Sequence, residues 1–271
     1  MTGLAKFTPG RKAVLVNVPH AGTFIPDDIA ATLTPAGRAM PDTDWHVDRL
    51  YVAALQMGCA MMVATHSRIV ADLNRDPSGA ALYPGASNTE LCPTSTFGDE
   101  PIYLDGKLPD AHEIERRRRV YWQPYHDRLA AEIEAIKAKH GYCILLDAHS
   151  IRSTVPRFFE GKLPDLNLGT ADGKSCAPQL ALEAFAALQS VPGFTAIHNG
   201  RFKGGYITRH YGRPDLQVHA LQLEIGQSCY MDESAPQPYD SAASAPLRQV
   251  LGKLIDTLVS VRSLSYSKLA N

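Results

Sequence analysis

An apolar run that stops abruptly at polar residues constrains the fold of this chain more than any other feature. Tyr142-Cys-Ile-Leu-Leu146 is followed directly by Asp-Ala-His149-Ser. A short continuous apolar run is typical of a strand that is buried on both faces, as in a parallel sheet. Ligands of open α/β sheets bind beyond the carboxyl ends of the strands, so His149 lies where such proteins carry out chemistry.

Other strands and helices alternate along the chain. Strands are predicted at residues 13–18, 59–65, 68–73, 142–150, 193–198 and 218–225. Helices are predicted at 26–33, from an N-cap at 42–44 to 57, at 110–140 with an interruption at Pro124, at 175–189 and at 245–264. Long loops are predicted at 78–109, 151–174 and 199–214. This alternation indicates an α/β sandwich with much parallel pairing.

Length and composition limit the possible classes of protein. The chain has 271 residues, and no internal repeat or linker divides it, so we expect a single domain over residues 1–271. The net charge of -1 predicts neither a nucleic-acid partner nor attraction to an anionic membrane.

The compartment is predicted from the cysteines and the N-terminus. The five cysteines are scattered without a CxxC pair, which is typical of a reducing compartment. Residues 1–12 lack the apolar segment of a signal peptide, and no apolar run could span a bilayer. We therefore expect a cytoplasmic protein. The sequence leaves its oligomeric state open.

Polar residues gather where the predicted strands end. His20, His149 and Glu224 lie at the ends of three strands, Asn74-Arg75 follows a fourth, and Asp44 and Asp48 begin a helix. Two imidazoles and a carboxylate can hold Zn²⁺ and leave a fourth position for water, and a further carboxylate can move a proton. Together these residues predict a mononuclear metal hydrolase.

Each of these residues also has a structural explanation. His20 follows a proline and could belong to a turn, Asp44 could cap a helix, and Asp48 could be solvated. Asn74-Arg75 could form a turn with a salt bridge. For Glu224 a functional role is favoured over a structural one. Burying a carboxyl group without a partner costs about 2–7 kcal/mol of free energy even when the group is neutral. The four arginines at 116–119 suggest a mostly solvated helix face.

Six motifs in this order resemble the N-formylglutamate amidohydrolases, also called N-formylglutamate deformylases. The motifs are Val-Pro-His-Ala-Gly at 18–22, residues 42–51, residues 67–77, Leu-Asp-Ala-His-Ser at 146–150, residues 199–212 and Leu-Gln-Leu-Glu-Ile at 221–225. The resemblance implies hydrolysis of N-formyl-L-glutamate to formate and L-glutamate, the last step of one histidine-degradation route. It also implies a three-layer α/β/α sandwich of the phosphorylase/hydrolase type, related to the zinc carboxypeptidases.

The resemblance also suggests roles for individual residues. His20 and His149 match the two histidine ligands of the wider superfamily. Thr23 stands where that superfamily carries a glutamate ligand. We therefore expect Asp44 to supply the carboxylate, with Asp48 as the alternative. The resemblance further implies that Asn74 and Arg75 bind the substrate's α-carboxylate and that Glu224 is the base.

The resulting hypothesis assigns one divalent ion, Zn²⁺, to His20, Asp44 and His149. Glu224 deprotonates the attacking water, and Arg68 helps the metal to stabilise the oxyanion. A second cation must bind the substrate's other carboxylate. Arg209 is the first choice, with Tyr206 of the same loop, and Arg157 and Arg201 rank behind it. Gly204-Gly205 could let this loop close.

Two alternatives remain at this stage. The chain could be a related hydrolase that acts on another N-acyl amino acid or a peptide. It could instead be a non-catalytic protein that binds dicarboxylates, which predicts no metal and no chelator-sensitive turnover.

Overall fold

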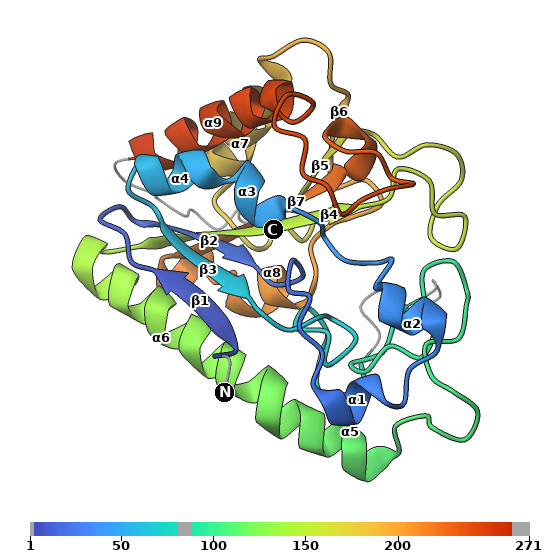
Figure 1. Cartoon of the computed structure of the whole chain (residues 1–271). Helices are drawn as coiled ribbons and strands as arrows, with labels where there is room; N and C mark the ends of the chain where they lie inside the picture. The colour runs from blue at the N-terminus through green and yellow to red at the C-terminus, as the bar shows by residue number, and fades with distance from the viewer. Residues whose placement is uncertain (1–2, 81–87, 262–271) are drawn as a thin grey trace.

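The computed structural model describes residues 3–80 and 88–261, and its centre is a mixed seven-stranded sheet (Figure 1). The strand order is β1-β3-β2-β4-β7-β5-β6. The four inner strands β3, β2, β4 and β7 are parallel to one another. β1 and β5 join antiparallel to β3 and β7, and β6 is parallel to β5. The prediction of a largely parallel mixed sheet is confirmed.

Five of the six predicted strands form, with shifted ends. The strands are β1 (Ala5–Thr8), β2 (Val14–Val18), β3 (Ala60–Ala64), β4 (Cys143–Ile151), β5 (Leu166–Gly169), β6 (Ala196–His198) and β7 (Val218–Gly226). The strand predicted at 68–73 is wrong, because this segment turns along the sheet edge and its polar groups bond to side chains of the site. The short strands β1 and β5 were not predicted.

Helices lie between most of the strands along the chain. They are α1 (Asp27–Ala30), α2 (Pro35–Ala39), α3 (Val47–Leu50), α4 (Val52–Gln56), α5 (Ala111–Arg117), α6 (Gln123–His140), α7 (Pro178–Gln189), α8 (Tyr206–Tyr211) and α9 (Ala245–Ser260), with short 3₁₀ turns at Pro214–Leu216 and Gln227–Cys229. The interruption predicted at Pro124 lies a few residues earlier, as a π-helical segment, Arg118–Trp122, between α5 and α6. Within the loops predicted at 151–174 and 199–214, β5 and α8 are additional elements. Residues 81–87 of the loop predicted at 78–109, and 262–264 of the last predicted helix, lie outside the described residues.

The four-arginine segment is not uniformly solvated. The side chain of Arg117 is 2 % exposed. It donates to Glu113 on the same helix, to the hydroxyl of Tyr103 and to the carbonyl of Ile69. These partners satisfy a buried guanidinium, so Arg117 fastens α5 to the segment that follows β3, whereas its neighbours stay nearer to the solvent.

Helices cover both faces of the sheet and make three layers (Figure 1). On one face, apolar residues of β2, β4 and β7 pack against α3, α4, α7 and α9. On the other, the alternate residues of these strands pack against α6 and α8. Every residue of β4 and β7 is buried, which explains the apolar run that begins β4 and the mainly apolar sequence of β7. The predicted α/β/α arrangement is confirmed, and the single domain over residues 1–271 stays a prediction.

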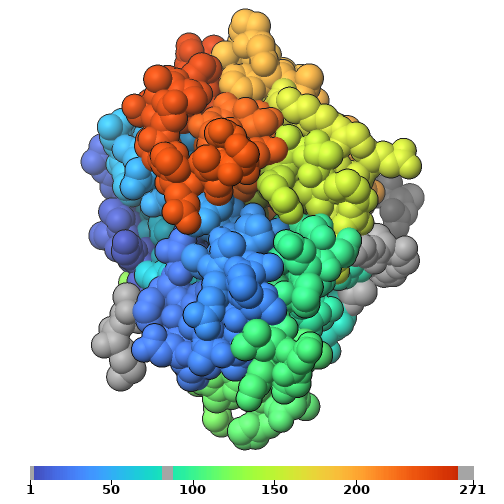
Figure 2. Space-filling view, turned by 45° about the vertical axis from the view of Figure 1, so that its right-hand side comes forward, coloured from blue at the N-terminus to red at the C-terminus, as the bar shows by residue number. Residues whose placement is uncertain are grey.

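The parallel strands end at a common edge, where the site lies. The loops that cover the molecule come from distant parts of the chain, and Figure 2 shows blue, green, yellow-green and orange-red segments meeting on one face. Among the described residues, no helix has the length and apolar character needed to cross a membrane.

Candidate metal centre and active site

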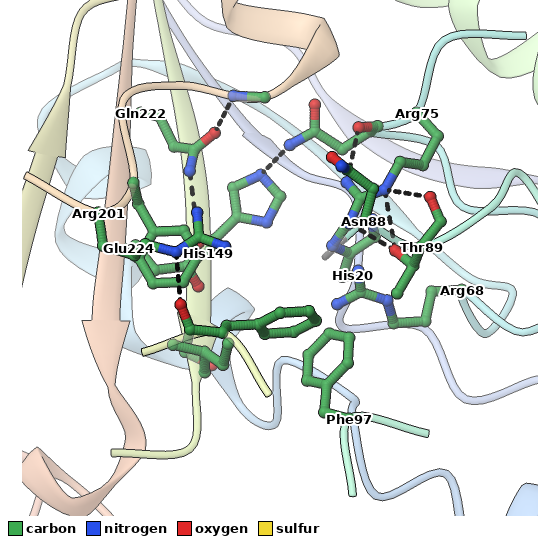
Figure 3. A pocket seen from close by; sticks show the side chains of 16 residues that line it. His20, Arg68, Arg75, Asn88, Thr89, Phe97, His149, Arg201, Gln222 and Glu224 are labelled. Atoms are coloured by element: carbon green, nitrogen blue, oxygen red, sulfur yellow. Dashed lines mark hydrogen bonds between the residues drawn. The ribbon is translucent and has the colours of Figure 1, made fainter. Parts of the chain in front are cut away.

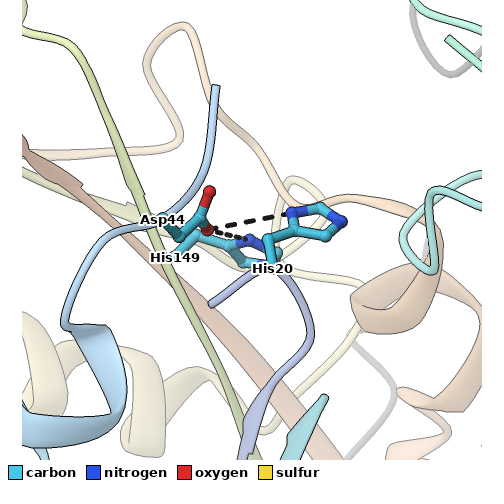
Figure 4. A group of neighbouring side chains, drawn as sticks. All are labelled: His20, Asp44 and His149. Carbon is cyan, nitrogen blue, oxygen red and sulfur yellow. Dashed lines mark hydrogen bonds and ion pairs between the residues drawn. The ribbon is translucent and has the colours of Figure 1, made fainter. Parts of the chain in front are cut away.

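Two histidines and an aspartate meet at the carboxyl edge of the sheet (Figure 4). His20 follows β2, His149 lies near the end of β4, and Asp44 precedes α3. Oδ2 of Asp44 is 3.0 Å from Nδ1 of His149 and 3.8 Å from Nδ1 of His20. All three side chains are almost fully buried. One ligand atom from each lies within 4.8 Å of the others, so the predicted ligands are brought together.

The other nitrogen of each imidazole faces a second buried carboxylate. Nε2 of His20 is 2.8 Å from Oδ1 of Asp72, and Nε2 of His149 is 3.0 Å from Oδ2 of Asp147. A carboxylate accepts hydrogen bonds, so Nε2 of His20 donates to Asp72. Nδ1 of both rings faces Asp44; Nδ1 of His149 lies at hydrogen-bond distance from it, whereas Nδ1 of His20 has no hydrogen-bond partner among the described residues. Pairing of this kind fixes the orientation and tautomer of metal-binding histidines.

The charges of the site reinforce this arrangement. Burial alone would raise the pKa of Asp72, but Arg68 at 2.6 Å, together with Arg75 and His20, outweighs burial and holds the pKa well below its usual value. Burial, with a further contribution from Arg68, lowers the pKa of His20. For His149, burial acts in the same direction, but Asp147 and Asp44 prevail and raise its pKa well above the usual value.

These residues fit a divalent metal ion. Nδ1 of His20 and Oδ1 of Asp44 are buried and have no hydrogen-bond partner among the described residues. Unpaired buried polar atoms are costly, and a cation between the two imidazoles and Asp44 would satisfy both. Two nitrogens and one carboxylate oxygen are also a ligand set that catalytic Zn²⁺ sites use. Asp48 lies in α3 outside this cluster, so the geometry favours Asp44 over Asp48.

Glu224 lies beside His149 on the neighbouring strand. The two residues are register partners of β4 and β7. Burial raises the pKa of Glu224 to about 8, with the nearby carboxylates Asp44 and Asp147 acting in the same direction. Such a carboxyl group takes up a proton more readily than an exposed one. Nε2 of Gln222 lies 3.3 Å from Oε2 of Glu224.

The cleft in front of the cluster has positively charged walls (Figure 3). It holds about 590 Å³ of space, including its open mouth. Arg201 lies on the same side as Glu224, and Arg75 and Arg68 lie on the opposite side. Arg68 also stacks on Phe97, with its guanidinium carbon 4.9 Å from the ring centre. Cations on two sides suit a small molecule with two anionic groups.

Some predicted substrate-binding residues lie elsewhere. Arg201 lines the cleft, but Arg209, Tyr206 and Arg157 are not among the described residues that line it. Arg209 donates from Nε to the carbonyl of Gly204, and Arg157 bonds the 95–96 segment. The geometry therefore favours Arg201 over Arg209.

Asn74 lines the cleft, yet protein partners already contact its amide. Oδ1 accepts from the backbone N–H of Ile207 at 2.8 Å. Nδ2 lies 3.3 Å from Asp147 and 3.0 Å from Nε2 of His149. These contacts link the start of α8 to the metal-binding cluster. They favour a supporting role for Asn74 over direct contact with the substrate.

Sequence reasoning missed Asp72, Asp147 and Gln222 as site residues. All three lie inside the motifs that carried the family resemblance, one or two residues from a residue singled out. Their positions offered a signal, because alternate residues of a strand share a face and Asp147 and Gln222 are two residues from His149 and Glu224.

The chain is similar to known N-formylglutamate amidohydrolases over nearly its whole length. The family model described as N-formylglutamate amidohydrolase matches residues 12–231. The N-formylglutamate deformylase of Pseudomonas aeruginosa is 44% identical over 260 residues, which cover 96% of this chain and 97% of that protein. The deformylase of Pseudomonas putida is 41% identical and covers 99% of this chain and 100% of the relative.

A solved structure supports the same assignment. The N-formylglutamate amidohydrolase of Ralstonia eutropha JMP134 has a TM-score of 0.78 and 28% identity, covering 93% of this chain and 96% of that one. A gene product of Agrobacterium tumefaciens shares the fold, with a TM-score of 0.68 at 17% identity and coverage of 94% and 96%. The chain therefore belongs to the N-formylglutamate amidohydrolase family, a family of amide-bond hydrolases.

Proposed function

We propose that this chain hydrolyses N-formyl-L-glutamate to formate and L-glutamate, with one Zn²⁺ ion held by His20, Asp44 and His149. The observation that carries the proposal is the buried His-Asp-His cluster, which lies beside Glu224 at the base of a cleft with cations on two sides. Membership of the family supports the choice of substrate.

Glu224 carries the proton in this reaction. When bound, the metal supplies a Lewis acid and lowers the pKa of water toward ~7. Glu224 takes a proton from the attacking water, whose oxygen forms the new bond to the formyl carbon. The carbon–nitrogen bond breaks, and Glu224 returns the proton to the departing nitrogen of glutamate. The raised pKa of Glu224 suits a group that must both accept and release a proton.

Arginines orient the substrate and stabilise the developing charge. Arg75 binds one substrate carboxylate and Arg201 binds the other from the opposite side of the cleft. A planar guanidinium can hold a carboxylate through two parallel hydrogen bonds. Arg68 faces the cleft beside His20 and stabilises the negative oxygen that develops on the formyl carbon. We also propose that this reaction is the last step of one histidine-degradation route, as the family resemblance implies.

Metal analysis combined with formate release tests the proposal. We expect the purified protein to contain about one zinc per chain. It should release formate from N-formyl-L-glutamate, and a chelator should abolish the activity reversibly. N-acetyl-L-glutamate tests the acyl group, and N-formyl-L-norvaline, which lacks the side-chain carboxylate, tests the second cation. A metal-free protein with full activity would refute the metal, and turnover of N-acetyl-L-glutamate alone would refute the substrate.

A further inference from the structure

Gln222 lies in β7 two residues before Glu224, so both side chains project from the same face of the strand. It is 3 % exposed and lines the cleft. A primary amide at such a position must have its hydrogen bonds satisfied, because an unpaired buried polar group is costly. The partners of this amide therefore determine its role.

The orientation of the Gln222 amide is fixed by the chain itself. The backbone N–H of Gly205 donates to Oε1 of Gln222 at 2.7 Å. A backbone N–H can only donate, so the amide oxygen must face Gly205 and the NH₂ group must face the other way. On that other side, Nε2 is 3.3 Å from Oε2 of Glu224. Gln222 can thus only donate to the Glu224 carboxyl.

Gly205 is itself held closely in place. A Cβ atom at this position would lie 2.3 Å from Nδ2 of Asn74, so the backbone fits here only as glycine. Two residues further along, the backbone N–H of Ile207 donates to Oδ1 of Asn74. The segment that begins α8 is therefore fixed between Asn74 and Gln222, and it gives the Gln222 amide a rigid support.

The donor that faces Glu224 is also neutral. His149 and Arg68 already act on Glu224 with positive charge, and Asp44 and Asp147 with negative charge. A further cation in place of Gln222 would lower the pKa of Glu224 and weaken it as a base. An amide orients one carboxyl oxygen without adding charge. The other oxygen is left to handle the proton of the attacking water.

We infer that Gln222 is a positioning residue, which holds the carboxyl group of Glu224 at the angle needed for proton transfer. Its amide is in turn oriented by the Gly205 N–H. The inference rests on the proposed function, because it assumes that Glu224 is the base.

The test uses the full-length, metal-loaded protein and the variant Gln222→Met, which keeps the length of the side chain and removes both hydrogen bonds. General bases contribute about 10²–10⁴-fold, so we expect a misaligned base to lower kcat for formate release by about 10–100-fold. KM should change less than about threefold, and the zinc content should stay the same. A kcat within twofold of the wild type would overturn the inference.

A double variant separates positioning from a general loss of structure. If Gln222 acts through Glu224, Gln222→Met should cause no further loss in a Glu224→Gln background. An equal loss in both backgrounds would overturn the inference. Ser175→Ala is the matched control, because it removes another buried hydrogen bond to β7, from Oγ to the carbonyl of Ala220 at 2.7 Å. It should lower the melting temperature and leave kcat unchanged.

Crystal structures of the wild type and Gln222→Met give a result that does not depend on the substrate. We expect the Glu224 carboxyl group to rotate or lose order in the variant. An unchanged Glu224 would overturn the inference even if the substrate were another N-acyl amino acid. Absence of wild-type formate release, with a displaced Glu224 in the variant, would refute the proposed function and leave the positioning role standing.

Discussion

Six buried ionisable side chains form one connected group, and their charges explain why a metal fits. Three buried carboxylates, Asp44, Asp72 and Asp147, contact the two histidines. Arg68 pairs with Asp44 and Asp72, and Arg75 lies 4.0 Å from Asp72. With both imidazoles neutral, the three carboxylates outnumber these two guanidiniums. A buried negative charge without compensation is very costly, and a divalent cation bound by His20, Asp44 and His149 would compensate it.

Glu224→Gln tests the base most directly. Glutamine keeps the size of the side chain but cannot accept a proton from the attacking water. We expect kcat to fall by about 10²–10⁴-fold, the usual contribution of a general base. Zinc content should stay near that of the wild type, because Glu224 is outside the His-Asp-His cluster. Near-normal kcat in this variant would refute the assignment of Glu224 as the general base.

Asp147→Asn tests the carboxylates behind the histidines. Asparagine keeps the size of the side chain that lies 3.0 Å from Nε2 of His149, but the negative charge that strengthens the imidazole as a ligand is lost. Loss of such a partner typically weakens metal binding about 10–100-fold. Competition with a chelator of known zinc affinity measures this. Unchanged affinity would show that Asp147 has only a structural role, and exposed Asp105→Asn serves as the control.

Arg201→Gln and Arg209→Gln distinguish two arginines of one segment. A hydrogen bond to a charged group contributes about 1.5–3 kcal/mol, so losing Arg201 should raise KM for N-formyl-L-glutamate about 10–100-fold. KM for N-formyl-L-norvaline should change little, because it lacks the carboxylate that Arg201 binds. Arg209→Gln should affect neither substrate strongly. If Arg209→Gln raises KM for N-formyl-L-glutamate and Arg201→Gln does not, Arg209 binds the carboxylate.

The residues that could be predicted share one property, a polar side chain at the end of an apolar strand. His20, His149 and Glu224 stand out in the sequence for this reason. Asp72 is different, because its role depends on His20 and Arg68, which reach it only in the folded chain. A linear pattern contains no such contact. The partners of buried polar groups are set by packing, and strand-end position alone does not reveal them.

At the scale of elements, the buried strands were predictable and the elements near the site were less so. β4 and β7 are buried along their whole length and are mainly apolar in sequence. β5 has only four residues, and the segment at 68–73 has a strand-like composition but forms turns. In that segment, side-chain bonds to Asp72 replace the sheet ladder. Tertiary contacts thus override local preference near the site.

The start of α8 gives a prediction about packing. Gly205→Ala places a methyl group about where the Asn74 amide lies, 2.3 Å from its nitrogen. Overpacking typically costs about 1–3 kcal/mol, and the displaced Asn74 and Gln222 should also reduce activity. Gly252→Ala in the middle of α9 is the control, because its Cβ meets nothing within 4 Å. There alanine should stabilise by about 0.5–1 kcal/mol. Equal melting temperatures for the two variants would contradict this account.

At the scale of the whole molecule, the site joins parts of the chain that are far apart in sequence. His20 follows β2, Asp44 precedes α3, and His149 lies in β4, so a metal bound by all three would connect distant segments. Ligands that bind only the folded state stabilise it in proportion to their affinity and concentration. The metal site should therefore contribute to global stability as well as to catalysis.

Removing the metal gives the corresponding prediction. At a free zinc concentration about 1,000 times Kd, binding stabilises the folded state by about 4 kcal/mol. For a chain of this size, each kcal/mol shifts the melting temperature by about 2–4 °C, so chelation should lower it by roughly 8–16 °C. Thermal unfolding with and without chelator, and after zinc is returned, measures the shift. His149→Ala should melt at a low temperature and should not respond to zinc. If the wild type and this variant respond equally to the chelator, the stabilising metal is bound elsewhere.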